Sequence, residues 1–461
     1  MSARAAAART AELLRAAEGR GLNAVLHWSE AHLEHEAARL ERDGLGVLGG
    51  MPVAVKDNIA TLDLPTTCAS RILEGYVSPF EATAVRRLRQ AGALIAAKTN
   101  LDEFAMGSST EHSAFGRVLH PMDPSRVPGG SSGGSAALVA AGVVPAALGS
   151  ETGGSVRQPA SFCGIVGVKP SYGRVSRYGL VAFGSSLDCI SVFGRTVRDA
   201  AQVLSAMSGR DPLDATTVDR PPVAVPSPAR SLEGLTVGLP TEYFPADLHP
   251  GVRAGMDRTI ETLRALGARI VEVSLPHSPY AVPTYYILAP AEASANLARY
   301  DGVRYGPPRA SGLPDVRALY RDTRGRGFGP EVRRRILVGT YVLSAGYYEA
   351  YYGKAQRMRA RIAQDFRTVF DGGVDLLLTP TTPTPAFKAG EKTEDPVQMY
   401  LADVFVCPAS LAGLPALSVP AGRSDGLPVG AQLMAPYLAD EQLLTVAAAL
   451  EQHLDGVAEV R

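Results

Sequence analysis

Two glycine- and serine-rich segments carry the residue types in this chain that are best suited to chemistry. GGSSGGS occupies residues 129–135, and ETGGS occupies residues 151–155. A flexible linker would separate two regions of different composition, but a small, apolar run directly follows the first segment (136–149). We therefore interpret the glycines as positions of close backbone approach and the serines as reactive groups.

Two known motifs are rejected for the first segment. A phosphate-binding loop needs a lysine directly after its last glycine, and the next lysine is Lys169. Gly129, Ser131 and Gly133 match the G-x-S-x-G spacing of a nucleophile elbow, which must follow a strand. The residues before it, 120–128, contain prolines that disfavour a strand. We therefore interpret the elbow spacing as accidental.

The remaining interpretation makes both segments walls of one site. The glycines before Ser155 allow backbone N–H groups to point into a cavity, which predicts an oxyanion hole from Thr152, Gly153, Gly154 and Ser155 itself. A serine needs a base to become a nucleophile, and none of the eight histidines lies in a convincing motif. This leaves lysine as the base, as in the Ser-Lys variant of the catalytic triad.

Lys56 is the best candidate for that base. It ends the apolar segment MPVAVKD (51–57), where burial disfavours an ammonium ion. The pKa must fall from about 10.4 by roughly three units, or about 4 kcal/mol, for the amine to be substantially neutral at pH 7. Arginine cannot do this, and only six of the 46 basic residues are lysines. Taken alone, a lysine at a strand end is more often part of a surface ion pair.

Composition bounds the class of protein. The 461 residues are 46% hydrophobic, and no stretch reaches the roughly 18 consecutive apolar residues of a membrane span. Lys plus Arg and Asp plus Glu are equal at 46 each, so no overall basic field would hold a nucleic acid. If RNA is involved, we expect a partner to bind it.

Cysteine usage and the amino-terminal residues bear on the compartment. The chain has four cysteines without a CxxC pair, which argues against a disulfide framework and a thiolate metal site. Residues 1–21 alternate charge with alanine and lack the apolar core of a signal peptide. These features predict a cytoplasmic protein with no metal site and no membrane association.

The hydrophobic patterns alternate between strands and helices. We predict a helical segment over 5–43, and two strand, helix, strand units that favour parallel pairing. The first unit comprises residues 51–57, 81–92 and 93–100, and the second comprises 235–240, 251–267 and 268–276. Strands at 374–380 and 415–420 and a helix at 439–454 follow. The predicted fold is one large α/β domain whose mixed, mostly parallel central sheet is covered by helices.

These motifs resemble a known family. KDN at 56–58, GGSSGGS, and GSETGGSVRQPA at 149–160 resemble the amidase signature family. TNLDEFAMGSSTEHSAFG at 99–116 and KPSYGRVSRYGLVAF at 169–183 are similar to its tRNA-dependent amidotransferase branch. The resemblance covers essentially the whole chain.

The resemblance implies a domain organisation. It makes 1–461 a single domain with the amidase signature fold. Within it, 1–50 form an amino-terminal helical segment and 51–200 form the signature core. Residues 229–461 complete the sheet and bind substrate.

The resemblance also implies a Ser-cisSer-Lys triad. Ser155 is the nucleophile and Lys56 is the base. Ser131 follows a cis peptide bond from Gly130 and relays the proton between them.

Two further residues are implied to bind the substrate. Arg335 would hold the α-carboxylate of glutamine as a bidentate clamp, and Asp403 would take its α-ammonium group. The choice among Arg333, Arg334 and Arg335 stays open, and an RRR run is often a solvated helix face.

The implied function is that of a glutaminase subunit. The chain would supply ammonia to a B subunit that binds tRNA and uses ATP and Mg²⁺ to amidate misacylated glutamyl- or aspartyl-tRNA, and a small C subunit would wrap around it. This chain itself would need no cofactor. The alternatives are a stand-alone amidase acting on another small or fatty amide, and a non-catalytic scaffold, which has no use for the triad.

Two departures from the branch are visible. Glu151 stands where the branch usually has aspartate, and DCISVFGR at 188–195 replaces a stretch usually close to DQIGPLTR. Neither touches the predicted triad.

Overall fold

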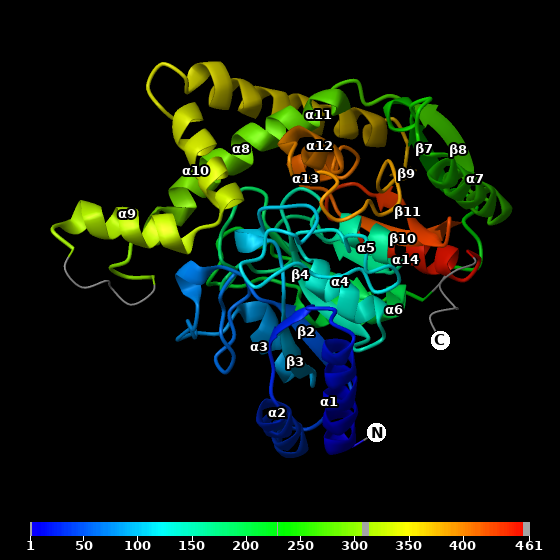
Figure 1. Ribbon diagram of the computed structural model, residues 1–461. Helices are drawn as coiled ribbons and strands as arrows, with labels where there is room; N and C mark the ends of the chain where they lie inside the picture. Colours follow the sequence, from blue (N-terminus) through cyan, green and yellow to red (C-terminus); the bar gives the residue numbers. More distant parts are fainter. Residues whose placement is uncertain (1, 228, 307–312, 455–461) are drawn as a thin grey trace.

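One mixed β-sheet runs through the molecule (Figure 1). The computed structural model describes residues 2–227, 229–306 and 313–454, and within them the sheet has eleven strands in the order β1-β3-β2-β4-β6-β5-β10-β11-β9-β7-β8. The strands are β1 (Val25–His27), β2 (Pro52–Lys56), β3 (Leu94–Thr99), β4 (Ala146–Glu151), β5 (Val166–Lys169), β6 (Cys189–Gly194), β7 (Thr236–Pro240), β8 (Arg269–Val273), β9 (Leu376–Pro380), β10 (Ala416–Ser424) and β11 (Leu427–Met434).

Helices surround the sheet. They are α1 (Ala3–Gly19), α2 (Glu30–Asp43), α3 (Thr83–Gln90), α4 (Gly133–Ala140), α5 (Arg157–Cys163), α6 (Val197–Met207), α7 (Pro250–Ala265), α8 (Ala281–Asn296), α9 (Val316–Gly327), α10 (Pro330–Val342), α11 (Lys354–Asp371), α12 (Pro396–Leu401), α13 (Cys407–Leu411) and α14 (Asp440–Glu451). Within the described ranges, none of these helices combines the length and apolarity needed to cross a lipid bilayer.

The α/β class and the mixed sheet are confirmed, but the expectation of a mostly parallel sheet is wrong. Four neighbouring pairs are parallel, and they join β2 to β3 and β4, and β7 to β8 and β9. The other six pairs are antiparallel. The two predicted strand, helix, strand units do form parallel pairs, whereas the antiparallel pairs involve strands that the hydrophobic pattern did not single out. One of them, β1, also interrupts the helical segment predicted over 5–43.

Both faces of the sheet are buried. Along β2, Val53 and Val55 join one apolar core while Ala54 joins the other, as the two-residue period of a strand requires. Helices α3, α6, α7 and α14 cover the first face, and α1, α2, α4 and α5 cover the second. The triad segments therefore lie in the interior of a three-layer structure.

A further layer of helices, α8, α10, α11 and α13, lies above the sheet in Figure 1, and α9 projects from it at the left. Helices α8 and α10 cross very closely. A Cβ at Gly339 of α10 would lie 1.9 Å from the Pro290 carbonyl oxygen of α8, so only glycine fits. This layer carries Arg335.

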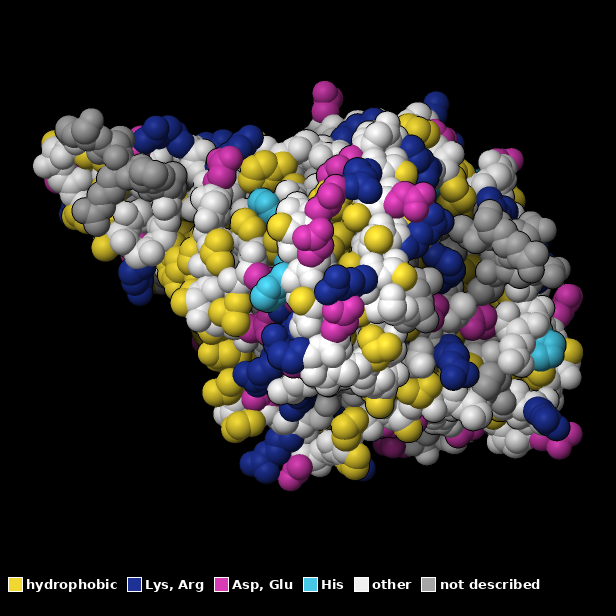
Figure 2. All heavy atoms as spheres, turned by 90° about the horizontal axis from the view of Figure 1, so that it is seen from below, with side chains coloured by type: hydrophobic (Ala, Val, Ile, Leu, Met, Phe, Trp, Pro, Cys, Tyr) yellow, Lys and Arg dark blue, Asp and Glu magenta, His cyan; other side chains and the backbone are white. Residues whose placement is uncertain are grey.

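One face of the surface matches the balanced charge of the chain. Figure 2 shows basic and acidic side chains interspersed on the face seen from below, without a large area of one sign. Such a face lacks the basic stripe that holds a nucleic-acid backbone.

Candidate active site

Lys56 and Ser131 meet in the interior, as predicted. Lys56 ends β2, and its Nζ donates hydrogen bonds to Ser131 Oγ (2.7 Å) and to the Ser150 carbonyl oxygen (3.2 Å). Neither Lys56 nor Ser131 is exposed to solvent. A hydroxyl can also donate, so the first contact can reverse and carry a proton to a neutral amine.

Burial makes Lys56 a usable base. Loss of solvation lowers the pKa of Lys56 to about 7, although the charges of Asp102 and Asp188 favour the ammonium form. About half of the amines are then neutral at pH 7. A lysine that acts as a base at neutral pH requires a fall of this size.

Burial alone does not identify the base, because Lys98 and Lys169 are also at most 1% exposed. Lys98 Nζ lies 3.1 Å from Asp57 Oδ1 and donates to Thr66 Oγ1. Lys169 donates to the carbonyl oxygen of Pro170. Lys56 differs from both because its neighbour is a serine of the predicted triad.

The segment around Ser131 is tightly held. The peptide bond between Gly130 and Ser131 is cis, as the family resemblance implied. The Ser131 carbonyl oxygen accepts the N–H of Asp102 (3.1 Å), and the N–H of Ser132 donates to the Ser155 carbonyl oxygen (3.2 Å). A Cβ at Gly130 would lie 2.2 Å from Asp102 Oδ2, so glycine is needed there. These contacts bring the two glycine- and serine-rich segments together.

Ser155 lies in a buried turn between β4 and α5. Four consecutive backbone N–H groups of this turn donate to no protein acceptor within the described ranges: those of Thr152, Gly153, Gly154 and Ser155. A Cβ at Gly154 would lie 2.2 Å from Val406 Cγ2, and one at Gly153 would lie 2.8 Å from the Tyr285 ring. Unpaired, buried donors beside a serine are the arrangement that an oxyanion hole needs.

A buried ion pair holds this turn. Glu151 Oε2 accepts the N–H groups of Val156 and Arg157 (3.1 Å each), and Arg157 Nε donates to Glu151 Oε1 (2.7 Å). Burial alone would raise the pKa of Glu151, but the Arg157 guanidinium outweighs burial and keeps it below its usual value. The glutamate at this departure from the branch thus still braces the turn that carries Ser155.

The structure separates the three consecutive arginines. Arg335 is 3% exposed, whereas Arg333 and Arg334 face solvent. A helix turns by about 100° per residue, so a single position of such a run points inward. Arg335 is the position that faces the interior.

Arg335 sits among aromatic rings. Its guanidinium carbon lies 5.1 Å from the ring centroid of Tyr286 and 5.5 Å from that of Tyr400, and these two rings stack on each other. Its Nε donates to Glu331 Oε1 (2.8 Å). One edge of the guanidinium is therefore fixed by Glu331, and the stacked tyrosines lie beside it.

Asp403 lies beside the turn that carries Ser155. A Cβ at Gly154 would lie 3.2 Å from Asp403 Oδ1. Asp403 Oδ2 accepts a hydrogen bond from the Ser108 hydroxyl, whereas the buried Oδ1 has no partner within the described part of the chain. Burial raises the pKa of Asp403 to about 7. A buried acceptor without a partner is costly, and a cationic group of a ligand would satisfy it.

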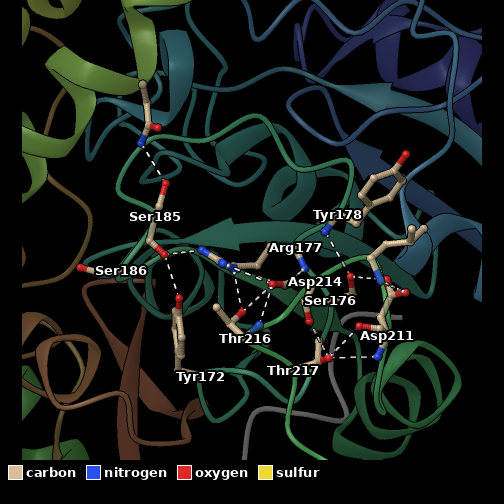
Figure 3. A network of polar contacts seen from close by, with 12 residues as sticks. Tyr172, Ser176, Arg177, Tyr178, Ser185, Ser186, Asp211, Asp214, Thr216 and Thr217 are labelled. Atoms are coloured by element: carbon tan, nitrogen blue, oxygen red, sulfur yellow. Dashed lines mark hydrogen bonds and ion pairs between the residues drawn. The ribbon is translucent and has the colours of Figure 1, made fainter.

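Residues 183–188 pack against the same turn from another side. A Cβ at Gly184 would lie 3.1 Å from Thr152 Cγ2. Figure 3 shows how this segment is held: the Ser185 carbonyl oxygen accepts hydrogen bonds from the Tyr172 hydroxyl (2.9 Å) and from Arg177, which also pairs with Asp214. The second departure from the branch begins here, and its residues form β6, where Cys189 pairs with Glu151 of β4.

A family model described as Amidase matches residues 9–444, which is most of the chain. The chain belongs to the amidase family. The predicted resemblance is therefore confirmed.

The relatives of this amidase carry a more specific name, the A subunit of glutamyl-tRNA(Gln) amidotransferase. The relative from Koribacter versatilis is 53% identical over 451 residues, covering 96% of this chain and 93% of that protein. Its namesake from Carboxydothermus hydrogenoformans is 57% identical over 411 residues, covering 89% and 84%. The crystal structure of the namesake from Thermotoga maritima matches with a TM-score of 0.75 and 50% identity, covering 88% of this chain and 83% of that one.

Several residues near the site of this amidase were not predicted from the sequence. The stacked rings of Tyr286 and Tyr400 lie beside Arg335, and Ser108 contacts Asp403. Ser108 lies in the FAMGSSTE stretch, whose similarity to the branch was a usable signal. The tyrosines come from α8 and α12, far from each other in sequence, and no local pattern marks them. Within the described residues, no group of three or more His, Cys, Asp or Glu side chains is arranged to hold a metal ion.

Proposed function

We propose that this amidase is the glutamine-hydrolysing subunit of a tRNA-dependent amidotransferase. Two buried side chains of opposite charge carry the proposal: Asp403 lies beside the Ser155 turn, and the Arg335 guanidinium is near enough to oppose the rise in the pKa of Asp403. Arg335 is complementary to an α-carboxylate, and Asp403 Oδ1, which has no partner among the described residues, is complementary to an α-ammonium group. Both are needed for glutamine and neither is needed for a simple amide.

The hydrolysis proceeds through an acyl-enzyme. Ser155 Oγ attacks the side-chain amide carbon of glutamine, while its proton passes to Ser131 and the proton of Ser131 passes to neutral Lys56. The free N–H groups of the turn stabilise the oxyanion of the tetrahedral intermediate. The C–N bond then breaks, and the amine takes the proton back along the same path and leaves as ammonia. Water attacks the ester, which releases glutamate and regenerates Ser155.

The substrate is positioned by groups that lie apart from the reacting atoms. Arg335 and Asp403 hold the two charged α-substituents and so fix the distance of the side-chain amide from the reacting serine. Binding energy gained at the α-carbon thus becomes correct orientation at the reacting carbon.

The ammonia serves a partner. The relatives are named as one lettered component of an amidotransferase, which supports an assembly of several different chains. We propose a B subunit that binds tRNA and uses ATP and Mg²⁺ to amidate misacylated Glu-tRNA(Gln) or Asp-tRNA(Asn), together with a small C subunit. In this assembly the chain requires no cofactor of its own and works in the cytoplasm. It comprises one amidase domain over 1–461, with internal boundaries near 50, 200 and 229.

Ammonia release tests this proposal. The purified chain would be assayed with glutamine and with butyramide, alone and then with the B and C subunits plus misacylated tRNA. We expect glutamine to be strongly preferred and its hydrolysis to rise sharply in the complete assembly. Brisk hydrolysis of butyramide by the chain alone, unaffected by partners, would instead indicate a stand-alone amidase.

A further inference from the structure

One short turn contacts both parts of the proposed site. Asp102 and Glu103 are adjacent and buried. The N–H of Asp102 donates to the carbonyl oxygen of Ser131, in the triad (3.1 Å). Glu103 Oε2 accepts the N–H of Gly329 (2.8 Å), the residue that caps the amino terminus of α10. Two neighbouring residues thus link the predicted proton relay to the helix that carries Arg335.

The contact of Glu103 with α10 is specific. Gly329 is followed by Pro330 and has no side-chain cap of its own, so the Glu103 carboxylate supplies the capping acceptor from another part of the chain. A negative charge at a helix amino terminus is also favoured by the helix dipole. A Cβ at Gly329 would lie 2.4 Å from Glu103 Oε2, so the residue at this joint must be glycine for the contact to form.

The other carboxylate oxygen is also engaged. Glu103 Oε1 accepts a hydrogen bond from the Ser70 hydroxyl, and Ser70 Oγ lies 3.2 Å from the carbonyl oxygen of Gly327, the last residue of α9. The Glu103 carboxylate therefore binds the joint between α9 and α10 directly at Gly329, and its partner Ser70 lies beside the Gly327 end. Phe328, between the two glycines, packs edge-on against Phe104.

The backbone of the turn is unusual. Phe104 and Ala105 have φ values of +51° and +62°, a left-handed conformation that residues with side chains rarely adopt in succession. Strained backbone of this kind persists where the surroundings fix it, and it clusters at functional sites. Here it directly follows Asp102 and Glu103, which contact two different parts of the site.

We infer that Glu103 is a positioning residue that sets α10, and with it the Arg335 guanidinium, at the correct distance from the reacting serine. This inference rests on the proposed function, because it assigns Arg335 to the α-carboxylate of glutamine. The Glu103 carboxylate binds Ser70 and Gly329 and none of the predicted catalytic residues within the described part of the chain. Substitution of Glu103 should therefore weaken the hydrolysis of glutamine, which uses Arg335, and leave that of butyramide, which does not, unchanged.

The test is a double-mutant cycle in the full chain assembled with its B and C subunits. We expect Glu103→Ala to raise the KM for glutamine by about tenfold and to change kcat/KM for butyramide by less than about twofold. In an Arg335→Ala background, Glu103→Ala should add less than about twofold to the KM for glutamine, because the group that it positions is gone.

Two further variants keep the inference testable if Glu103→Ala fails to fold. Glu103→Gln retains an acceptor for the Gly329 N–H and should keep the KM within about threefold of the parent. Gly329→Ala introduces a Cβ against the carboxylate at a φ of −70°, which alanine adopts freely, and should raise the KM without altering butyramide hydrolysis. Glu36→Ala is a control for the loss of a buried carboxylate away from α10, because Glu36 accepts the N–H of Ile95 and pairs with Arg39 and Arg89.

The outcomes separate the two proposals. Equal losses on glutamine and butyramide, or additive effects of Glu103→Ala and Arg335→Ala, would show a merely structural role and overturn the inference. An unchanged KM for glutamine in Arg335→Ala itself would overturn the proposed function, and the role of Glu103 with it. A raised KM in Arg335→Ala but not in the Glu103 and Gly329 variants would overturn the inference alone.

Discussion

The two parts of the proposed site are built in different ways. The triad part lies at the ends of β2 and β4 and in two glycine-rich turns, where every predicted catalytic residue is enclosed by the sheet and its helices. The clamp part lies in the helical layer above the sheet: Asp403 is in the turn between α12 and α13, and α10 buries Arg335 while Leu337 on the same helix is 70% exposed. Turns fixed by a sheet can provide the rigid backbone donors that hydrolysis of every amide requires. Side chains from the helical layer can instead recognise the substituents of one particular amide.

This difference between the triad part and the clamp part predicts that triad variants lower the hydrolysis of all amides equally. Ser155→Ala removes the attacking oxygen and should lower ammonia release from both glutamine and butyramide by about 10⁴-fold or more. Ser161→Ala on the adjacent helix α5 is the control and should retain most activity. A Ser155→Ala protein that lost glutamine hydrolysis but kept butyramide hydrolysis would contradict this prediction.

Lys56→Arg tests the base. Arginine stays protonated, so we expect about a 10³-fold loss of kcat on both substrates with the fold intact by circular dichroism. Lys354→Arg, at an exposed lysine, should be indistinguishable from the parent. An active Lys56→Arg protein would eliminate Lys56 as the base.

Arg335→Ala should separate the two parts. Loss of a buried, charge-assisted clamp is expected to raise the KM for glutamine by about 100-fold, or about 2.7 kcal/mol, and to leave butyramide hydrolysis unchanged. Arg334→Ala is the matched control, because Arg334 faces solvent one residue away. A large effect of Arg334→Ala with none of Arg335→Ala would transfer the clamp to its neighbour.

The two parts also differ in how far the sequence predicted them. Lys56, Ser131 and Ser155 lie in local motifs, because a turn that exposes N–H groups needs glycines within a few residues, and the structure places all three segments together. Arg335 could not be separated from Arg333 and Arg334, because burial of a helix face depends on α8 and α12, which lie elsewhere in the chain. Glu103 is likewise visible only through its contact with Gly329, 226 residues away.

The fold shows the same limit. Strand, helix, strand units predicted the parallel pairs β2–β3 and β7–β8, since both partners are close in sequence, but not the pairs β2–β4 and β7–β9, whose partners are far apart. The central antiparallel strands β4, β5 and β6 are short, apolar and rich in small residues, so they lack the alternation that marks a half-exposed strand. The β10–β11 hairpin did carry a local signal: Asp425 and Gly426 form its two-residue turn with φ of +51° and +79°.

The smallest expected difference between the triad part and the clamp part is in their pH dependence. In the proposed mechanism Lys56 acts only when neutral, so kcat/KM for butyramide should fall about tenfold per pH unit below about 7. Asp403 holds an ammonium group only when ionised, and its pKa is also raised to about 7, so kcat/KM for glutamine should fall more steeply, approaching a slope of two. Asp403→Asn should bring the glutamine profile back to a slope of one. Parallel profiles for both substrates in the parent would contradict a separate role for Asp403.

Covalent labelling tests the central claim most directly. A glutamine analogue with a chloroketone in place of the side-chain amide would be incubated with the assembled protein, and the modified residue would be located by peptide mass spectrometry. We predict a single label on Ser155 that excess glutamine prevents and that forms much more slowly in Arg335→Ala. A label on another residue, or one formed equally fast without Arg335, would contradict a serine nucleophile that receives glutamine from a separate clamp.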